Sequence, residues 1–321
     1  MGQFLSNCSI DSLNIAAKAL KDGSLVAFPT ETVYGLGADA ANELAVSRIY
    51  EVKGRPSDHP LIVHIADSKY LEQWISEIPE YAIDLARIFW PGPMTLILKR
   101  SDLAQDFVTG NQNTVGIRIP DNPLALGLLE AFHNLGGTGI AAPSANRFGQ
   151  VSPTTAAAVQ EEIGDFLADS DLVLDGGSSE VGLESTIIDC TSGAPRILRP
   201  GAITIEMIEK VTGKTITKEF SNSNIRVSGS LENHYAPKAK VILDQEPITG
   251  SGYIALENIP TPYGVIRLAA PKSVEEFARL LYESMREGDH QNLTTIYIEQ
   301  PKGAGLAVAI RDRLSRSARG R

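Results

Sequence analysis

The chain has 321 residues, of which 43% are hydrophobic and 21% charged, with a formal net charge of −10. This length favours about two domains, and this composition is that of a globular protein able to bury a core. The acidic balance argues against a protein that holds nucleic acid through a broad positive field. A phosphate-bearing ligand would therefore have to be bound by a local group of cations.

Cys8 and Cys190 lie far apart in the sequence and form no metal-binding pattern, which is typical of reduced thiols in a cytosolic protein. No apolar run approaches the roughly 18 residues of a membrane span, and no signal peptide precedes the first polar segment. We therefore expect a cytoplasmic protein that makes no membrane contact.

Hydrophobic periodicity predicts alternating helices and strands through the first two hundred residues. In chain order we expect a helix over 11–21, a strand over 24–28, a helix over 42–50, a strand over 61–65, helices over 70–75 and 81–89, strands over 94–98 and 114–120, a helix over 124–132, a strand over 139–146, a helix over 155–163, strands over 171–175, 184–189 and 196–202, and a helix over 205–211. This alternation indicates the α/β class.

Gly35-x-Gly37-x-x-Ala40 follows a strand and precedes a helix, as the dinucleotide-binding fingerprint does. In that fingerprint the first glycine ends the strand, whereas here several residues separate Gly35 from the strand expected over 24–28. We therefore interpret the glycines as positions where a second strand or turn passes close to a ligand bound by Thr30 and Thr32.

The composition changes after the helix over 205–211. Residues 215–233 are polar with little periodicity, which is typical of a linker. Strands over 241–243, 252–256, 264–268 and 294–298, with helices over 274–285 and 306–314, then predict a small α/β domain. We expect a first domain over 1–213, a linker over 214–238 and a second domain over 239–321.

Several arginines gather near the C-terminus. Cations are favourable at the end of a helix in any case, so a contact with RNA is only an alternative for them. These residues are Arg311, Arg313, Arg316, Arg319 and Arg321.

Lys53 and Arg55 lie in a loop with Gly54 and Pro56 that runs directly into the strand over 61–65. A lysine point charge and an arginine fork can grip separate phosphate oxygens, so the pair suits a polyanion. Taken alone, the Lys-x-Arg pattern is also typical of a solvated surface turn.

The polar residues expected at strand ends and loops are mostly cations and hydroxyl donors, which indicates an anion pocket in an acidic protein. They are Thr32, Lys53, Arg55, His59, His64, Arg118, Ser144, Asn146, Ser152, Ser185 and Arg199. The sequence has no serine-triad spacing, zinc pattern or Walker loop. Phosphoryl or nucleotidyl transfer by positioning and charge neutralisation remains, with magnesium carried on the phosphates.

Five blocks, spanning residues ~10 to 213, resemble in order the threonylcarbamoyl-AMP synthases, the YrdC-like proteins. The first is the paired signature Lys53-x-Arg55 with Ser144-x-Asn146. The others are Pro29-Thr-Glu-Thr-Val-Tyr-Gly-Leu-Gly37, Phe89-Trp-Pro-Gly-Pro-Met-Thr95, Gly116-Ile-Arg-Ile-Pro120 and Ser185-Thr-Ile-Ile-Asp189. His234-Tyr-Ala-Pro237 and the C-terminal α/β segment resemble the longer, two-domain form of the family.

The resemblance implies a twisted mixed sheet flanked by helices, followed by a small Rossmann-like domain. It implies that ATP, L-threonine and bicarbonate, with Mg²⁺ carried on ATP, become threonylcarbamoyl-AMP and pyrophosphate. A tRNA threonylcarbamoyl transferase would use the product to modify tRNA. The carbamate oxygen of carboxylated threonine would attack the α-phosphate without a protein nucleophile.

The resemblance also assigns site residues by position. Its catalytic signature is Lys53, Arg55, Ser144 and Asn146, with Lys53 and Asn146 facing the phosphates and their magnesium and no metal held by protein ligands. It implies ATP contacts from Arg55, His59, Thr114, Ser144, Ser152, Arg199 and Tyr235. It implies L-threonine contacts from Thr32, His64, Arg118, the backbone of Ala142, and Ser185. No residue is identified as a general base.

The linker departs from the family pattern. The approach to His234 reads Ser228-Gly-Ser-Leu-Glu-Asn233, and Glu232 would be unfavourable near a triphosphate unless it points away. Two alternatives stay open. One is an RNA-binding module of the same fold, which lacks support because the chain is acidic and does not interleave aromatic with basic residues. The other is a carbamoyl-transfer domain of hydrogenase maturation, whose zinc-finger and acylphosphatase segments are absent from this sequence.

Overall fold

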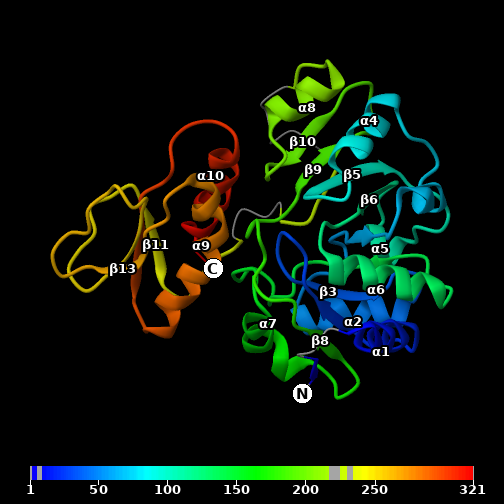
Figure 1. Cartoon of the computed structure of the whole chain (residues 1–321), viewed down its shortest axis with the longest axis horizontal. Coiled ribbons are helices and arrows are strands. Elements are labelled where there is room, and N and C mark those ends of the chain that lie inside the picture. Colours follow the sequence, from blue (N-terminus) through cyan, green and yellow to red (C-terminus); the bar gives the residue numbers. More distant parts are fainter. Residues whose placement is uncertain (1, 6–8, 217–224, 230–233, 321) are drawn as a thin grey trace.

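A computed structural model describes residues 2–5, 9–216, 225–229 and 234–320. Figure 1 shows a larger α/β part that carries the N-terminus and a smaller α/β part that carries the C-terminus. Helices α9 and α10 of the smaller part lie between its own strands and the larger part. Within the described residues no helix is both long and apolar enough to cross a bilayer.

The larger part is built on a mixed sheet of ten strands. Their order is β1-β8-β2-β3-β7-β4-β6-β5-β9-β10, and the sheet contains both parallel and antiparallel pairs of strands. The strands are β1 (Gln3–Leu5), β2 (Val26–Phe28), β3 (Gly35–Asp39), β4 (Ile62–His64), β5 (Met94–Lys99), β6 (Thr114–Arg118), β7 (Ile140–Ala141), β8 (Leu172–Leu174), β9 (Thr186–Asp189) and β10 (Arg196–Arg199).

Helices cover both faces of this sheet. They are α1 (Ile10–Lys21), α2 (Glu43–Lys53), α3 (Leu71–Trp74), α4 (Glu80–Phe89), α5 (Asp106–Thr109), α6 (Pro123–Asn134), α7 (Ala156–Ile163) and α8 (Ile205–Thr212). Helices α1 and α6 share a core with Val26 and Phe28, whereas α2, α4 and α7 share another with Ala27. Successive strand residues point to opposite faces, so the expected α/β layering is present.

The smaller part has a parallel four-stranded sheet in the order β11-β14-β12-β13. Its strands are β11 (Lys240–Leu243), β12 (Gly252–Ile254), β13 (Ile266–Ala269) and β14 (Thr295–Ile298), and its helices are α9 (Val274–His290) and α10 (Leu306–Ser317). A core of this part includes Phe277, Leu281, Ile310, and also Val33 and Leu183 of the larger part. The two parts therefore share buried apolar surface.

The glycines at 35 and 37 lie in strand β3, which pairs antiparallel with β2 and with β7. A Cβ on Gly37 would lie 2.7 Å from Ile140 Cγ2 and 2.9 Å from the Phe28 ring. Glycine is thus required there by the close approach of neighbouring side chains, and these glycines belong to a second strand rather than to a dinucleotide-binding turn.

The loop of the Lys53-x-Arg55 signature is built by the end of α2. Asn42 caps the helix N-terminus, and Gly54 ends the helix in the left-handed conformation with φ 61°. Arg55 then leads through Pro56 and Pro60 into β4, whose His64 pairs with Arg118 of the parallel strand β6. The basic stretch therefore begins at the end of α2 and ends in the sheet, where His64 lies beside Arg118.

Candidate functional site

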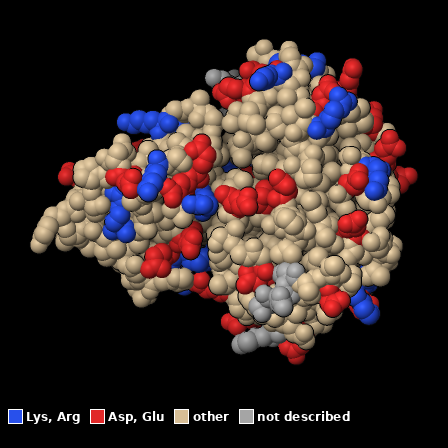
Figure 2. All heavy atoms as spheres, viewed as in Figure 1, with Lys and Arg blue, Asp and Glu red and all other residues tan. Residues whose placement is uncertain are grey.

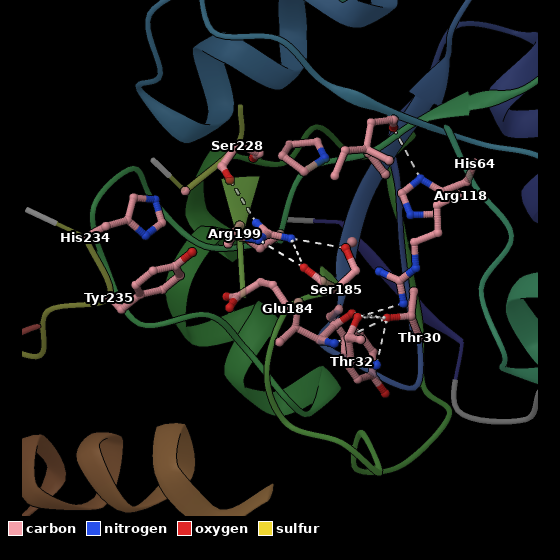
Figure 3. Close-up of a pocket in the computed structure, with 18 residues that line it drawn as sticks. Thr30, Thr32, His64, Arg118, Glu184, Ser185, Arg199, Ser228, His234 and Tyr235 are labelled. Atoms are coloured by element: carbon pink, nitrogen blue, oxygen red, sulfur yellow. Dashed lines mark hydrogen bonds between the residues drawn. The ribbon is translucent and has the colours of Figure 1, made fainter. Parts of the chain in front are cut away.

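A pocket lies where β3, β4, β6 and β10 meet the loops before β3, before β9 and after β7, together with Ser228, Gly229, His234 and Tyr235. Arg199 and Ser185 occupy its middle, with His234 and Tyr235 on one side and Thr32 with Arg118 on the other (Figure 3). Its lining residues are Thr30, Thr32, Val33, Tyr34, Gly35, Ile62, His64, Arg118, Ala142, Pro143, Ser144, Glu184, Ser185, Arg199, Ser228, Gly229, His234 and Tyr235.

One side of the pocket combines a buried arginine with hydroxyl groups. The Arg118 guanidinium donates to Thr32 Oγ1 over 2.9 Å and forms an ion pair of 2.7 Å with Glu31. Thr30 Oγ1 lies 2.8 Å from Thr32 Oγ1. A guanidinium beside hydroxyls suits a small molecule that bears both a carboxylate and polar hydrogen-bonding groups.

His64 lies beside this cluster and is buried edge-on against the Phe28 ring. Burial, reinforced by the charge of Arg118, lowers the pKa of the His64 imidazole to about 3. The ring is therefore neutral at physiological pH and a weak base. It is suited to orient a ligand by hydrogen bonding rather than to remove a proton.

The other side of the pocket is cationic. The Arg199 guanidinium donates to the Ser185 carbonyl over 2.9 and 3.1 Å and to the Ser228 carbonyl over 2.9 Å. Arg55 donates to the Pro60 carbonyl over 2.9 Å and to Ser228 Oγ over 3.3 Å. Ser228 of the linker thus touches both guanidiniums.

Lys53, Arg55 and Arg199 are all buried, with exposed fractions of 2%, 7% and 4%. Within the described part of the chain none of them forms an ion pair with a carboxylate. Burial lowers the pKa of all three, to about 10 for Arg55. Buried cations without counter-charges are costly in a free protein, and a bound polyanion would relieve that cost.

Lys53 lies behind the pocket rather than in its wall. Its ammonium donates to the carbonyls of Ser144 and Asn146, and the Ser144 hydroxyl donates to Asn146 Oδ1 over 2.6 Å. The two halves of the signature are therefore joined directly, and Lys53 fixes the loop that presents Ser144. Removing this ammonium would strand two buried carbonyls, so we expect Lys53→Ala to destabilise the fold as well as the site.

The remaining sequence-predicted residues lie around the pocket. Thr114 lines an adjoining hollow that shares Ile62 and Ser228 with it. Ser152 donates to Glu184 over 2.6 Å, and the His59 ring packs edge-on against Phe148. The structure brings Thr32, His64, Arg118, Ala142, Ser144, Ser185, Arg199 and Tyr235 into one lining, with Lys53, Arg55, His59, Thr114, Asn146 and Ser152 outside it.

Comparisons with known proteins point in one direction. The family model described as "Telomere recombination" matches residues 18–201, and the model described as "Threonylcarbamoyl-AMP synthase, C-terminal domain" matches residues 203–319. The protein from Pyrococcus abyssi named threonylcarbamoyl-AMP synthase is 39% identical over 95% of this chain and 94% of its own. That from Bacillus subtilis, with the same name, is 41% identical over 95% and 92%. The chain belongs to the threonylcarbamoyl-AMP synthase family.

The fold agrees with this family across both parts. The crystal structure of Pyrococcus abyssi Sua5 complexed with L-threonine superimposes with a TM-score of 0.87 at 38% identity, covering 99% of this chain and 97% of that one. The mixed sheet with flanking helices and the second, parallel sheet both match, so the expected fold class is confirmed.

The linker of this family member enters the pocket through His234 and Tyr235. Their rings contact each other at 4.1 Å, and Tyr235 also stacks on Tyr282 of α9 at 5.8 Å. The Tyr235 hydroxyl is buried and has no hydrogen-bond partner among the described residues. A buried, unused hydroxyl at a pocket wall is a candidate ligand contact. Glu232 lies outside the described residues, as does Cys8.

Sequence reasoning missed three side chains of this threonylcarbamoyl-AMP synthase site. Glu31 pairs with Arg118, Glu184 accepts from Ser152, and His234 lines the pocket. Glu31 and Glu184 do stand directly before Thr32 and Ser185, yet the sequence does not show that a carboxylate will be buried. The signal for His234 was its place in the His-Tyr-Ala-Pro block.

The C-terminal arginines are largely used inside the protein. Arg313 is fully buried, Arg316 pairs with Asp312, and Arg311 donates to the carbonyls of Pro301 and Gly303. On the face shown in Figure 2, acidic and basic side chains are interspersed. The contact between this tail and RNA therefore loses its main support.

The described residues contain no group of three or more histidine, cysteine, aspartate or glutamate side chains placed to hold a metal ion.

The two buried histidines predict how stability depends on pH. Burial lowers the pKa of His64 and of His234 to about 3, whereas the unfolded imidazole titrates near 6.5. Below pH 6.5 these two imidazoles bind protons in the unfolded chain but stay neutral in the folded chain. The free energy of unfolding therefore falls as the pH drops from 6.5 towards 3. We expect a loss of about 2 kcal/mol per histidine at pH 5, measured by urea unfolding at pH 7.5 and 5. His234→Asn should weaken this dependence of stability on pH. An unchanged dependence in that variant would contradict a lowered pKa of His234.

Proposed function

We propose that this chain is a nucleotidyltransferase that converts ATP, L-threonine and bicarbonate into threonylcarbamoyl-AMP and pyrophosphate. The observation that carries the proposal is the pairing of two half-sites. Arg118 with Thr32 forms one, and the buried cations Arg55 and Arg199 form the other, with Ser185 between them. Family membership and the L-threonine complex of the Pyrococcus abyssi relative support the same reading.

The proposed amino acid site uses Arg118 for the threonine carboxylate. The hydroxyls of Thr32 and Ser185, the neutral ring of His64 and the backbone at Ala142 would orient the amine and the side-chain hydroxyl. The amine condenses with bicarbonate to give a carbamate and water. Holding the carbamate beside the nucleotide turns a bimolecular encounter into an oriented reaction, which is a large part of the rate enhancement.

In the nucleotide half, a carbamate oxygen attacks the α-phosphorus, and the bond from that phosphorus to the bridging oxygen of the β-phosphate breaks. The departing pyrophosphate gains charge, which Arg55 and Arg199 neutralise. Mg²⁺ is brought by ATP as part of the substrate. Thr114, His59, Ser152 and Tyr235 would contact the nucleotide, with Lys53 and Asn146 holding the loop of Ser144. The product would then pass to a tRNA threonylcarbamoyl transferase.

The test is pyrophosphate release by the full-length chain with MgATP and bicarbonate, with and without L-threonine. We expect release only when L-threonine is present. L-valine has the shape of threonine without its hydroxyl, and a site that hydrogen-bonds that hydroxyl should reject it strongly. Release that is independent of L-threonine, or that is equal with L-valine, would count against the proposal.

Tyr235 offers a prediction about the nucleotide half. Because it lies on the linker side of the pocket, Tyr235→Ala should weaken ATP binding by about tenfold or more, corresponding to about 1.4 kcal/mol, and L-threonine binding much less. Calorimetric titration with each ligand measures the two effects. Tyr235→Phe is the matched control, since it removes only the unpaired hydroxyl. Equal losses for both ligands would reject a role on the ATP side.

A further inference from the structure

The junction of the two parts contains a buried arginine that lies outside the pocket lining and contacts two of its residues, Glu184 and Tyr235. Arg313 of α10 is 0% exposed. Its Nε donates to Glu184 Oε2 over 2.8 Å, and its Nη2 donates to the Pro200 carbonyl over 3.0 Å. One guanidinium thus bridges the segment that leads into β9 and the residue that follows β10.

These two anchor points immediately adjoin two pocket residues. Glu184 precedes Ser185, and Pro200 follows Arg199. Ser185 and Arg199 are bonded to each other through Ser185 Oγ and the Arg199 guanidinium at 3.1 Å. A guanidinium that holds both flanking positions fixes the spacing of the Ser185–Arg199 pair, because its donors are in a rigid planar fork.

The same helix also holds the linker residue of the pocket. The Arg313 guanidinium lies 5.2 Å from the centre of the Tyr235 ring, and Ser317 donates from Oγ to the Tyr235 carbonyl over 2.7 Å. Tyr235 has φ 63°, an uncommon conformation for a residue with a side chain. Arg313 and Ser317, one helical turn apart in α10, therefore both contact Tyr235, whose backbone has this uncommon conformation.

Glu184 completes the arrangement from the other side. Its carboxylate accepts hydrogen bonds from Arg313, from Ser152 at 2.6 Å and from Tyr282 at 3.0 Å. Burial alone would raise the pKa of Glu184, but the charges of Arg313 and Arg199 and these hydrogen bonds lower it to about 2. The carboxylate is ionised in the folded protein, so the junction contains a permanent buried ion pair.

We propose that Arg313 is a positioning residue, through which α10 of the C-terminal part sets the geometry of Ser185, Arg199 and Tyr235. It acts through Glu184 and the Pro200 carbonyl and contacts no reacting atom. The role rests on the proposed function of the site, because Ser185 and Arg199 belong to its two half-sites. A substitution of Arg313 in α10 should therefore reduce the activity of the pocket.

The first experiment compares Arg313→Met, Glu184→Gln and the double variant in the pyrophosphate assay and in thermal unfolding. Arg313→Met leaves the buried Glu184 carboxylate without its ion-pair partner, and Glu184→Gln leaves the buried Arg313 paired only with Asp312 at 2.6 Å. Both changes should therefore lower the unfolding midpoint, Arg313→Met by more. The double variant removes both charges and should recover much of the midpoint, while kcat/KM stays at least about tenfold below wild type. Recovery of stability and kcat/KM together, or wild-type kcat/KM in Arg313→Met, would overturn the proposal. If Arg313→Met does not fold, Arg313→Lys retains the charge without the fork and should lose kcat/KM in the same direction.

The matched control is Glu162→Gln. Glu162 forms a second, largely buried arginine–glutamate pair across the junction, with Arg286 at 2.6 Å. Its exposed side-chain fraction of 9% is close to the 7% of Glu184. We expect Glu162→Gln to lower the unfolding midpoint and to retain kcat/KM. An equal loss of kcat/KM in Glu162→Gln would show a general effect of the junction and contradict a specific role for Arg313.

Hydrogen exchange separates this proposal from the proposed function. In Arg313→Met the amides of residues 184–189 and 196–201 should exchange faster than in wild type, with smaller changes in β4 and β6. This readout requires no catalysis. Unchanged exchange in those segments would overturn the positioning role even if the wild type is active. Faster exchange in Arg313→Met, together with a wild type that releases no pyrophosphate with L-threonine, would refute only the proposed function.

Discussion

Arg118→Met is expected to raise the KM for L-threonine by at least about a hundredfold in the pyrophosphate assay. Arg118 is the cation beside Thr32, and a charge-assisted contact with a carboxylate is worth about 3 kcal/mol in a buried site. That free energy corresponds to about two powers of ten in affinity. ATP binding, measured by calorimetry, should change little because Arg118 lies on the other side of Ser185.

The control for this change addresses Glu31, which the substitution leaves buried without a cation. Removing one partner of a buried ion pair costs about 3–5 kcal/mol of stability, so Arg118→Met should also lower the unfolding midpoint. Combining it with Glu31→Gln should restore much of the midpoint without restoring threonine affinity. A double variant that regains wild-type KM would show that Arg118 serves only to neutralise Glu31.

Arg55→Met is expected to reduce kcat for pyrophosphate release by about a thousandfold, at the upper end of what one charge-stabilising group contributes in other sites. Unlike Arg118, Arg55 is buried without a carboxylate partner among the described residues, and burial lowers its pKa to about 10. Replacing such a cation with an apolar side chain removes a desolvation cost. The loss of Arg55 also leaves the Pro60 carbonyl without its donor, so we expect the unfolding midpoint to change little, and less than in Lys53→Ala, while activity is lost.

Arg55→Lys provides the matched comparison, since it keeps the charge and loses the planar fork. It should retain more activity than Arg55→Met at a similar KM for L-threonine. Substantial pyrophosphate release by Arg55→Met, or a sharp fall in its unfolding midpoint, would show that Arg55 supports the fold rather than the departing pyrophosphate.

The expected effect on stability distinguishes Arg55 from Lys53, although the two are separated by one residue. The Lys53 ammonium satisfies the buried carbonyls of Ser144 and Asn146, so its loss should harm the fold. The two cations of one short motif therefore have different physical tasks. One holds a loop in place, and the other faces the linker residue Ser228 at the edge of the pocket.

Residues 1–213, 214–238 and 239–321 remain our proposal for the domains and linker. The linker region approaches the pocket through Ser228, and the described part of it also bonds to the larger part, where Arg226 exchanges backbone hydrogen bonds with the Gln112 side chain. Such contacts make its path specific even though its sequence is polar and aperiodic.

Local sequence determined much of this protein. The periodicity of apolar residues predicted most of the helices and strands, because such elements have a face to bury, but not β1, β3 or α5. The signature blocks pointed to the family, and Arg118 and Ser144 fell in the pocket as expected.

Tertiary structure alone decided which charges are paired. The ion pairs of Arg118 with Glu31 and of Arg313 with Glu184 join residues distant in sequence, and no local pattern specifies such partners. It also decided that Lys53 lies behind the pocket and that Arg313, in a tail that suggested an RNA contact, is fully buried. Burial and pairing set the charge state and the cost of each group, and both depend on contacts that exist only once the chain has folded.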